Sequence, residues 1–261
     1  MKLLGIDTNA KTVKGQKKGY LTAITYLAPS DASGVTNTCP SASRGCRRAC
    51  LFTSGRGRMS NVMEARINKT KLFVEDQTAF MLQLKKEITA FIKKASKLNL
   101  IPCVRLNGTS DIAWEDIKLD GKNIMEYFSD LQFYDYTKRL ARVAAYANGK
   151  LPKNYHLTFS RSENTGDETV KDILNRGVNV AVVYADELPA YDFGFVEVIN
   201  GDESDLRFRD KMGVIVGLVY KRTTETIDDA IESGFVLHGE ILKRVQHDLD
   251  KTKGENAMAI S

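Results

Sequence analysis

The stretch Ile101-Pro-Cys-Val-Arg-Leu-Asn-Gly-Thr-Ser-Asp111 is a short apolar run that ends in a cluster of small polar residues. Five other short runs in the chain have the same form. All six runs are rich in Val, Ile, Tyr and Phe and are bounded by Gly, Asn, Asp or Ser, which is the composition of β-strands. The sequence therefore predicts six strands, each followed by polar residues. The other five runs cover residues 20–27, 131–136, 155–159, 178–184 and 195–199.

Helical patterns separate several of these strands. Apolar residues recur at helical spacing over residues 60–98, where Asp76 marks a break or a second N-cap. A shorter helix is predicted over 167–175 and is stopped by Gly177. Two further helix candidates are residues 137–147 and 224–232.

Strands that alternate with helices predict an α/β fold with a mostly parallel sheet. The polar residues that follow the strands then gather at the carboxyl edge of the sheet, where α/β proteins build their sites. The connections 185–194 and 201–212 are short for helical crossovers. We therefore expect an incomplete or irregular TIM-like barrel, with a three-cysteine loop after its first main strand.

Length and composition are those of an ordinary globular protein. We expect one α/β domain over residues 1–240 and a flexible tail over 241–261, which is polar and lacks a core pattern. No apolar stretch approaches the roughly 18 residues of a membrane span. The first residues show no apolar signal core. A cytoplasmic location without membrane contact is the expectation.

Three cysteines, Cys39, Cys46 and Cys50, fall within one short segment, and Cys103 is the only other cysteine. Thiolates crowded in a loop commonly hold a soft metal or an iron–sulfur cluster. Three protein ligands leave a coordination position open, whereas structural zinc sites close with four. The alternative is that the thiols simply pack as small hydrophobes. Cys103 lies inside a predicted strand and is expected in the core.

Basic residues crowd around the cysteines. Eight lie between Arg44 and Lys71, and only Glu64 opposes them, although the whole chain carries a formal charge of only +5. The patch suits a nucleotide or a nucleic acid. A solvated surface and charge compensation of a thiolate cluster are equally open interpretations. The residues predicted to contact such a partner are Arg44, Arg47, Arg48, Arg56 and Arg58.

Two polar turns supply candidate ligand-binding residues. Gly108 permits close backbone approach in the first turn, although Asp111 is also suited to a capping role. The second turn, residues 200–205, carries three carboxylates and is about as well explained as an ordinary acidic turn. Catalytic residues stay unassigned. The predicted cofactor-binding residues are Asn107, Gly108, Thr109, Ser110, Asp111, Lys138, Arg161, Asp202, Glu203 and Asp205.

The order of a strand, three cysteines, a long helix and a strand that ends in Arg105-Leu-Asn-Gly-Thr-Ser-Asp111 resembles the front half of radical S-adenosylmethionine enzymes. That resemblance implies a [4Fe–4S] cluster on Cys39, Cys46 and Cys50, and S-adenosylmethionine at the turn after the second main strand. The chain departs from those enzymes in its cysteine spacing, six and then three intervening residues, and in its Asn-Gly-Thr-Ser-Asp turn.

A narrower resemblance covers most of residues 15–220. The motifs Cys39-Pro to Cys50, Arg105 to Asp111, Phe133-Tyr-Asp-Tyr-Thr-Lys138 and Gly201-Asp-Glu-Ser-Asp205 are similar to those of phage and prophage proteins of the gene product 88-like group. This group implies a place in a phage-infected or prophage-carrying bacterial host. It implies no particular activity.

Three hypotheses follow. The first is an iron–sulfur enzyme, similar to the radical type, that acts on a nucleotide or nucleic acid. The second is a zinc-stabilised nucleic-acid-binding protein of phage replication without catalytic chemistry. The third is a cofactor-free α/β protein whose thiols are buried. The substrate, the reaction and the oligomeric state do not follow from the sequence.

Overall fold

The structure is a computed structural model that describes the 261-residue chain apart from residues 7–9, 195 and 240–261. The predicted tail over 241–261 therefore lies outside the described residues. Within the described part, every helix is too short or too polar to cross a bilayer.

The centre of the molecule is one mixed sheet. Its strands are ordered β1-β2-β3-β4-β5-β6-β9-β8-β7, and β10 pairs with β6 beside this path. Neighbouring strands are parallel except in the pairs β1–β2 and β7–β8. The strands are β1 (Leu4–Ile6), β2 (Tyr20–Thr25), β3 (Ile101–Arg105), β4 (Gln132–Thr137), β5 (Tyr155–Ser160), β6 (Val180–Tyr184), β7 (Tyr191–Asp192), β8 (Val196–Asn200), β9 (Ile215–Val219) and β10 (Val236–Leu237).

The six predicted strands are confirmed as β2, β3, β4, β5, β6 and β8. The long helical pattern divides as predicted into α3 (Ser60–Glu75) and α4 (Gln77–Lys97), because the Asp76 carboxylate accepts a hydrogen bond from the backbone N of Ala79 at 2.8 Å and caps the second helix. Helix α7 (Asp167–Asn175) ends before Gly177, whose φ of +77° suits a glycine. The remaining helices are α1 (Ala10–Gln16), α2 (Arg44–Arg48), α5 (Ile124–Tyr127), α6 (Leu140–Ala147) and α8 (Ile227–Glu232).

The α/β class and the mostly parallel sheet are confirmed, whereas a barrel is not. The sheet is open: its path ends at β1 and β7, and the described residues provide no pairing between these two strands. The short connections explain part of the irregularity. The segment between β8 and β9 carries only the single 3-10 turn η4 (Arg207–Arg209) in place of a crossover helix.

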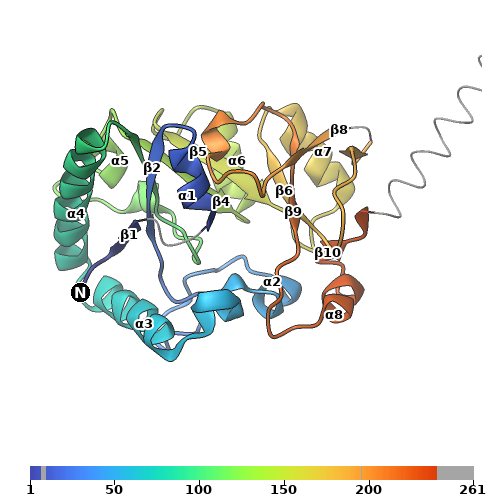
Figure 1. Cartoon of the computed structure of the whole chain (residues 1–261), viewed down its shortest axis with the longest axis horizontal. Coiled ribbons are helices and arrows are strands. Elements are labelled where there is room, and N and C mark those ends of the chain that lie inside the picture. The colour runs from blue at the N-terminus through green and yellow to red at the C-terminus, as the bar shows by residue number, and fades with distance from the viewer. Residues whose placement is uncertain (7–9, 195, 240–261) are drawn as a thin grey trace, which may run out of the picture.

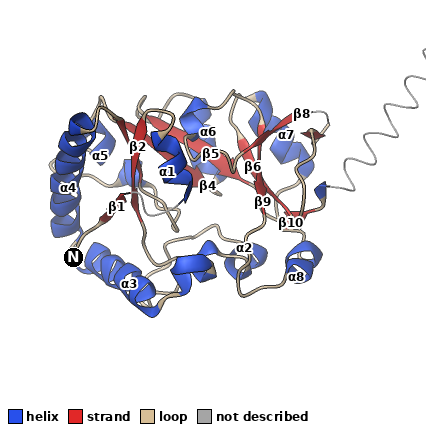
Figure 2. Ribbon diagram, viewed as in Figure 1, coloured by secondary structure: helices blue, strands red, loops and turns tan. Residues whose placement is uncertain are grey.

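Different segments of the chain pack on the two faces of the sheet. Figure 2 shows the strands crossing the middle of the molecule, with α4 and α5 at one end and α7 at the other. Phe80 and Leu84 of α4 pack with Val104 and Phe133 of the sheet in the main apolar core. On the opposite face, Leu206 packs on Cys103 and Tyr134, so the predicted core position of Cys103 is confirmed.

The carboxyl edge of the sheet is where the candidate site lies. Strand β2 leads into residues 38–59, which we name the cysteine segment. In Figure 1 this segment, with α2, runs along the lower side of the molecule together with α3 and α8. The edge is therefore covered by residues from both halves of the chain.

A buried carboxylate joins three strands at this edge. Asp135 of β4 is fully buried and accepts hydrogen bonds from the backbone N of Asn107 at 2.7 Å and from the Tyr155 hydroxyl at 2.8 Å. The Tyr155 hydroxyl in turn accepts from Nη2 of Arg142 on α6 at 2.7 Å. The end of β3, the middle of β4, β5 and α6 are thereby held in fixed positions.

We expect Asp135 to make stability depend on pH. Burial raises the pKa of this carboxyl to about 7, against the lowering effect of its hydrogen bonds. Between pH 3.8 and about pH 7, the Asp135 carboxyl is protonated in the folded protein and ionised in the unfolded chain. The free energy of unfolding therefore falls as the pH rises from about 4 to about 7. The slope is at most about 1.4 kcal/mol per pH unit.

The measurement is the free energy of unfolding in denaturant between pH 5 and pH 8. The Asp135→Asn variant should be less stable than wild type at pH 5 and should lose the downward slope. Exposed Asp130 gives the matched control, because Asp130→Asn should keep the slope. A wild-type profile that rises over this window would contradict the assignment.

Candidate functional site

The cysteine segment is anchored at its centre by Glu163, which follows β5. The carboxylate accepts hydrogen bonds from the Ser43 hydroxyl at 2.6 Å and from the backbone N of Gly45 at 2.7 Å. Ser43 also caps α2 by accepting from the backbone N of Cys46 at 3.2 Å. A Cβ at Gly45 would lie 2.7 Å from Cβ of Phe235, so only glycine fits here.

The far end of the segment is tied to the residues between β9 and α8. Nε of Arg48 lies 2.9 Å from Oε1 of Glu225, whose side chain is buried, and the Ser54 hydroxyl donates to the backbone O of Arg222 at 2.9 Å. Cys46 also packs beside the small apolar cluster that holds Phe235. The segment thus spans the carboxyl edge from β2 to the ends of β6, β9 and β10.

The three cysteines of this segment are free and partly buried. Burial raises the pKa of all three thiols, and it raises that of Cys50 to about 11 with help from the charges of Cys46 and Cys39. The thiols are therefore close enough to influence one another and are protonated at neutral pH.

The thiols are not arranged around a single ion. In the described part of the chain, no three His, Cys, Asp or Glu side chains are placed to hold one metal ion. A single zinc needs every sulfur about 2.3 Å from one point. A four-iron cluster makes a different demand, because each thiolate binds a separate iron and the sulfurs stand farther apart. The described part of the chain therefore contains no preformed site for a single metal ion.

The turn over residues 107–111 lies directly against the cysteine segment. The Cys39 thiol donates toward the backbone O of Thr109 at 3.6 Å, and the backbone N of Asp111 donates to the O of Thr38 at 2.8 Å. The Thr109 hydroxyl donates to the O of Leu27 at 2.6 Å. The structure thus brings together the two strongest sequence motifs.

The amide oxygen of Asn107 is satisfied within this turn and by the adjoining residues. Oδ1 of Asn107 accepts hydrogen bonds from the Ser110 hydroxyl, the backbone N of Ile112 and the indole N–H of Trp114 at 2.8 to 3.0 Å. A Cβ at Gly108 would lie 2.6 Å from the ring of Tyr26, so glycine is required here. Ligand binding by this turn stays a prediction.

Lys138 and Asp111 lie on the same side of the site. Oδ2 of Asp111 accepts from the backbone N of Lys138, and Oδ1 accepts from Nη1 of Arg142, both at 2.9 Å. The Lys138 ammonium donates to the backbone O and the hydroxyl of Ser160 and to the backbone O of Arg161. Its three protons are therefore occupied, and its influence on the site is electrostatic: it lowers the pKa of the Cys46 thiol, which burial raises.

The other predicted ligand residues serve different places. Nη1 of Arg161 donates to the O of Gly234 at 2.9 Å and so supports the turn before β10. Asp202 accepts from the backbone N of Val219, and Glu203 is exposed. Asp205 is buried against the opposite face of the sheet, where it meets Arg105 and Tyr134.

Sequence reasoning gave no role to Arg66 of α3. Its guanidinium lies 5.0 Å from the Tyr26 ring and 5.4 Å from the Phe52 ring, and its buried Nη1 has no hydrogen-bond partner among the described residues. Its charge lowers the pKa of the neighbouring Cys50 thiol. Arg66 belonged to the basic run, but only the fold shows that it faces inward beside a cysteine.

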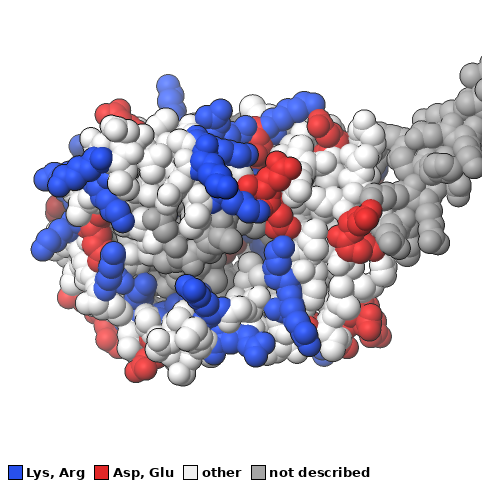
Figure 3. All heavy atoms as spheres, viewed as in Figure 1, with Lys and Arg blue, Asp and Glu red and all other residues white. Residues whose placement is uncertain are grey.

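The basic residues of the segment are not equivalent. Arg47 pairs with Asp31 at 2.8 Å, and Arg48 pairs with Glu225. Figure 3 shows Lys and Arg side chains gathered along the lower edge of the molecule, on the side of α2 and α3. Three arginines are exposed and form no ion pair with any described residue: Arg44, Arg56 and Arg58.

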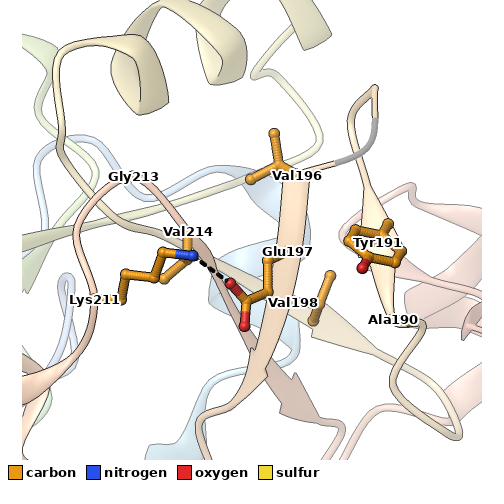
Figure 4. Close-up of a pocket in the computed structure, with 8 residues that line it drawn as sticks. All are labelled: Ala190, Tyr191, Val196, Glu197, Val198, Lys211, Gly213 and Val214. Carbon is orange, nitrogen blue, oxygen red and sulfur yellow. Dashed lines mark hydrogen bonds and ion pairs between the residues drawn. The ribbon is translucent and has the colours of Figure 1, made fainter.

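A hollow of about 690 Å³ lies elsewhere, at the β7–β8 edge of the sheet. Figure 4 shows Tyr191, Val196 and Val198 around it, with an ion pair between Lys211 and Glu197 at 2.8 Å on one side. None of its lining residues is a predicted site residue. We assign it no role in the chemistry of the cysteines.

Comparison with known proteins places the chain in a family. The family model described as gene product 88 matches residues 2–239. The chain belongs to the gene product 88 family. The resemblance to this phage protein family is thereby confirmed, whereas no comparison supports the similarity to radical S-adenosylmethionine enzymes. Neither the curated proteins nor the solved structures contain a match.

We expect three of the four thiols to be reachable in the native gene product 88-family protein. Cys39, Cys46 and Cys50 are partly exposed, whereas Cys103 is fully buried and burial raises its pKa to about 12. In metal-free protein, Ellman's reagent should therefore count three slowly reacting thiols, whose rates rise with pH, and a fourth only in denaturant.

Variants identify the reacting thiols. Cys103→Ala should leave the native count at three, and Cys50→Ala should lower it to two. A native count of zero would instead support the cofactor-free hypothesis with inaccessible thiols.

Proposed function

We propose that the chain is an iron–sulfur cluster-binding phage or prophage enzyme, similar to the radical type, that acts on a nucleotide or nucleic acid. Cys39, Cys46 and Cys50 would hold a [4Fe–4S] cluster, and S-adenosylmethionine is the candidate ligand for the iron that no cysteine binds. The fold would count as an incomplete barrel whose carboxyl edge is bridged by the cysteine segment. These finer statements are our hypothesis.

The observation that carries the proposal is the gathering of three thiols at the carboxyl edge of a mostly parallel sheet, beside two partly buried cations. The thiols are neutral without metal, so cluster binding must release their protons and leave negative charge. Lys138 beside Cys46 and Arg66 beside Cys50 supply positive charge where that negative charge would form.

The residues around the thiols hold and orient them. Glu163 and Ser43 fix α2, which carries Cys46. The backbone O of Thr109 contacts the Cys39 thiol, and Asn107 fixes the turn that presents this carbonyl. The cluster, when bound, would supply electron transfer, and these residues would keep its ligands in place and its pocket closed to water.

The test is metal analysis of protein purified without oxygen. We expect a brown protein with about four iron and four sulfide per chain. Alanine at Cys39, Cys46 or Cys50 should reduce both to roughly a tenth or less. Cys103→Ala is the matched control, because this thiol lies on another face and should not change the iron content. A colourless, iron-free wild-type protein made under these conditions would refute the proposal.

A second candidate function is a zinc-stabilised nucleic-acid-binding protein of phage replication without catalytic chemistry. The observation in its favour is the set of exposed arginines, Arg44, Arg56 and Arg58, which form no ion pair with any described residue. Such side chains are free to neutralise phosphates and release bound cations. This candidate predicts zinc in place of iron, with DNA or RNA binding that weakens as salt is added.

We expect the Arg56→Gln/Arg58→Gln variant to bind single-stranded DNA or RNA more weakly and with a shallower salt dependence. Two lost phosphate contacts should reduce the slope of log affinity against log salt by about 1.4 on a single strand. Fluorescence anisotropy at several salt concentrations measures the slope. The control is Lys93→Gln/Lys94→Gln, which removes the same charge from exposed positions on α4. An equal loss in both variants would indicate a non-specific charge effect.

A further inference from the structure

One face of the sheet is unusually polar for the interior of an α/β fold. Side chains alternate along β-strands, so Tyr136 of β4 and Thr158 of β5, which are register partners, face away from the apolar core that holds Phe133 and Leu157. Arg105 at the end of β3 lies on the same face, with its guanidinium 4.7 Å from the Tyr136 ring. Buried parallel strands normally carry aliphatic residues on both faces.

Several polar groups on this face have no hydrogen-bond partner. The Thr158 side chain is fully buried, and its hydroxyl is unpartnered among the described residues. Three other buried atoms also lack a hydrogen-bond partner among the described residues: Nε of Arg105, Nε2 of His156 and Nη1 of Arg207. Leaving such groups unpaired costs about 1–3 kcal/mol each, so four on one face point to a missing partner. We name Arg105, Tyr136, His156, Thr158 and Arg207 the donor face.

The four groups named above can each donate a hydrogen bond, and the acceptor without a hydrogen bond beside them, Oδ2 of Asp210, is paired by charge with Arg207. Guanidinium nitrogens are donors only, and the Thr158 hydroxyl can donate. Nδ1 of His156 lies 2.9 Å from the Tyr146 hydroxyl, and donation by that hydroxyl leaves the proton on Nε2. Burial lowers the pKa of His156 to about 4, so the ring is neutral at pH 7. The missing partner is therefore an acceptor.

The guanidinium groups of Arg105 and Arg207 are each held in place by an aspartate. Nη1 of Arg105 lies 3.2 Å from both carboxylate oxygens of Asp205, and the Tyr134 hydroxyl donates to the same carboxylate at 2.9 Å. Nε of Arg207 lies 3.2 Å from Oδ2 of Asp210. The Arg105 side chain is 18% exposed, so an outside ligand can reach it. Each guanidinium group is thus fixed by a carboxylate and still has an N–H group without a hydrogen-bond partner.

We propose that the donor face binds a phosphate group of the substrate. Two guanidinium groups beside neutral donors match the several acceptor oxygens of a phosphate better than a single carboxylate. The inference deepens the proposed function, on whose nucleotide substrate it rests. Tyr136 and Thr158 are each followed two residues later by Lys138 and Ser160, which are hydrogen-bonded to each other. The donor face therefore continues to the lysine that acts on the Cys46 thiol.

The test is isothermal titration of the full-length protein with inorganic phosphate and with adenosine 5′-monophosphate, at fixed ionic strength. The key variant is Thr158→Val, which removes a buried hydroxyl without changing the shape of the side chain. We expect it to weaken binding about tenfold, as for the loss of one hydrogen bond to a charged group. Its melting temperature should equal or exceed that of wild type, because no partner in the ligand-free protein is lost.

Thr25→Val is the matched control. The Thr25 hydroxyl is also buried and unpartnered, but this residue follows Ile24, the register partner of Arg105, and so faces the other side of the sheet. This variant should gain the same stability and keep full affinity. Tighter binding of the nucleotide than of inorganic phosphate would identify a nucleotide source, and equal affinities would identify free phosphate.

Three outcomes would overturn the proposal: no saturable binding of either phosphate compound, equal affinity in Thr158→Val and wild type, or equal binding of succinate. The titrations are repeated with the Cys46→Ala variant, which lacks one proposed cluster ligand. Phosphate binding should persist there. A failure of the cluster proposal can therefore be told apart from a failure of the phosphate proposal.

Discussion

The arrangement of the carboxyl edge depends on the buried carboxylate of Asp135. A carboxylate without solvent must be satisfied by donors, and here they come from the end of β3 and from β5. Asn107, which provides the first of these donors, also accepts three hydrogen bonds within its own turn. The turn that meets Cys39 is therefore positioned by the interior of the sheet. A site built on such a turn is rigid, because the turn is hydrogen-bonded to the buried core.

The cysteine segment spans the carboxyl edge of the open sheet from β2 to the ends of β6, β9 and β10. Polar anchors hold it at Glu163 and Glu225, and an apolar cluster seats Cys46 beside Phe235. These partners come from the second half of the chain, so the site forms only when both halves are folded. The absence of a crossover helix between β8 and β9 leaves one face of the sheet to the η4 segment, which brings Asp205 and Arg207 onto it.

Two chemical environments thus meet at Lys138. On one side are thiols whose pKa values are raised by burial and partly offset by Lys138 and Arg66. On the other side lies a row of hydrogen-bond donors without acceptors. A substrate anchored by its phosphate on the donor face would extend toward the cysteines. This arrangement joins the two proposals without making either depend on the other for its test.

The sequence by itself determined the elements whose signals are local. The six strands, the break at Asp76 and the stop before Gly177 follow from alternation, capping and backbone freedom within a few residues. It also determined the family and the crowding of the three cysteines. Only the tertiary structure decided that β9 lies between β6 and β8, that Asp205 faces Arg105, and that Arg66 turns inward. These outcomes depend on partners far apart in the chain, and local pattern carries no information about which distant residues will meet.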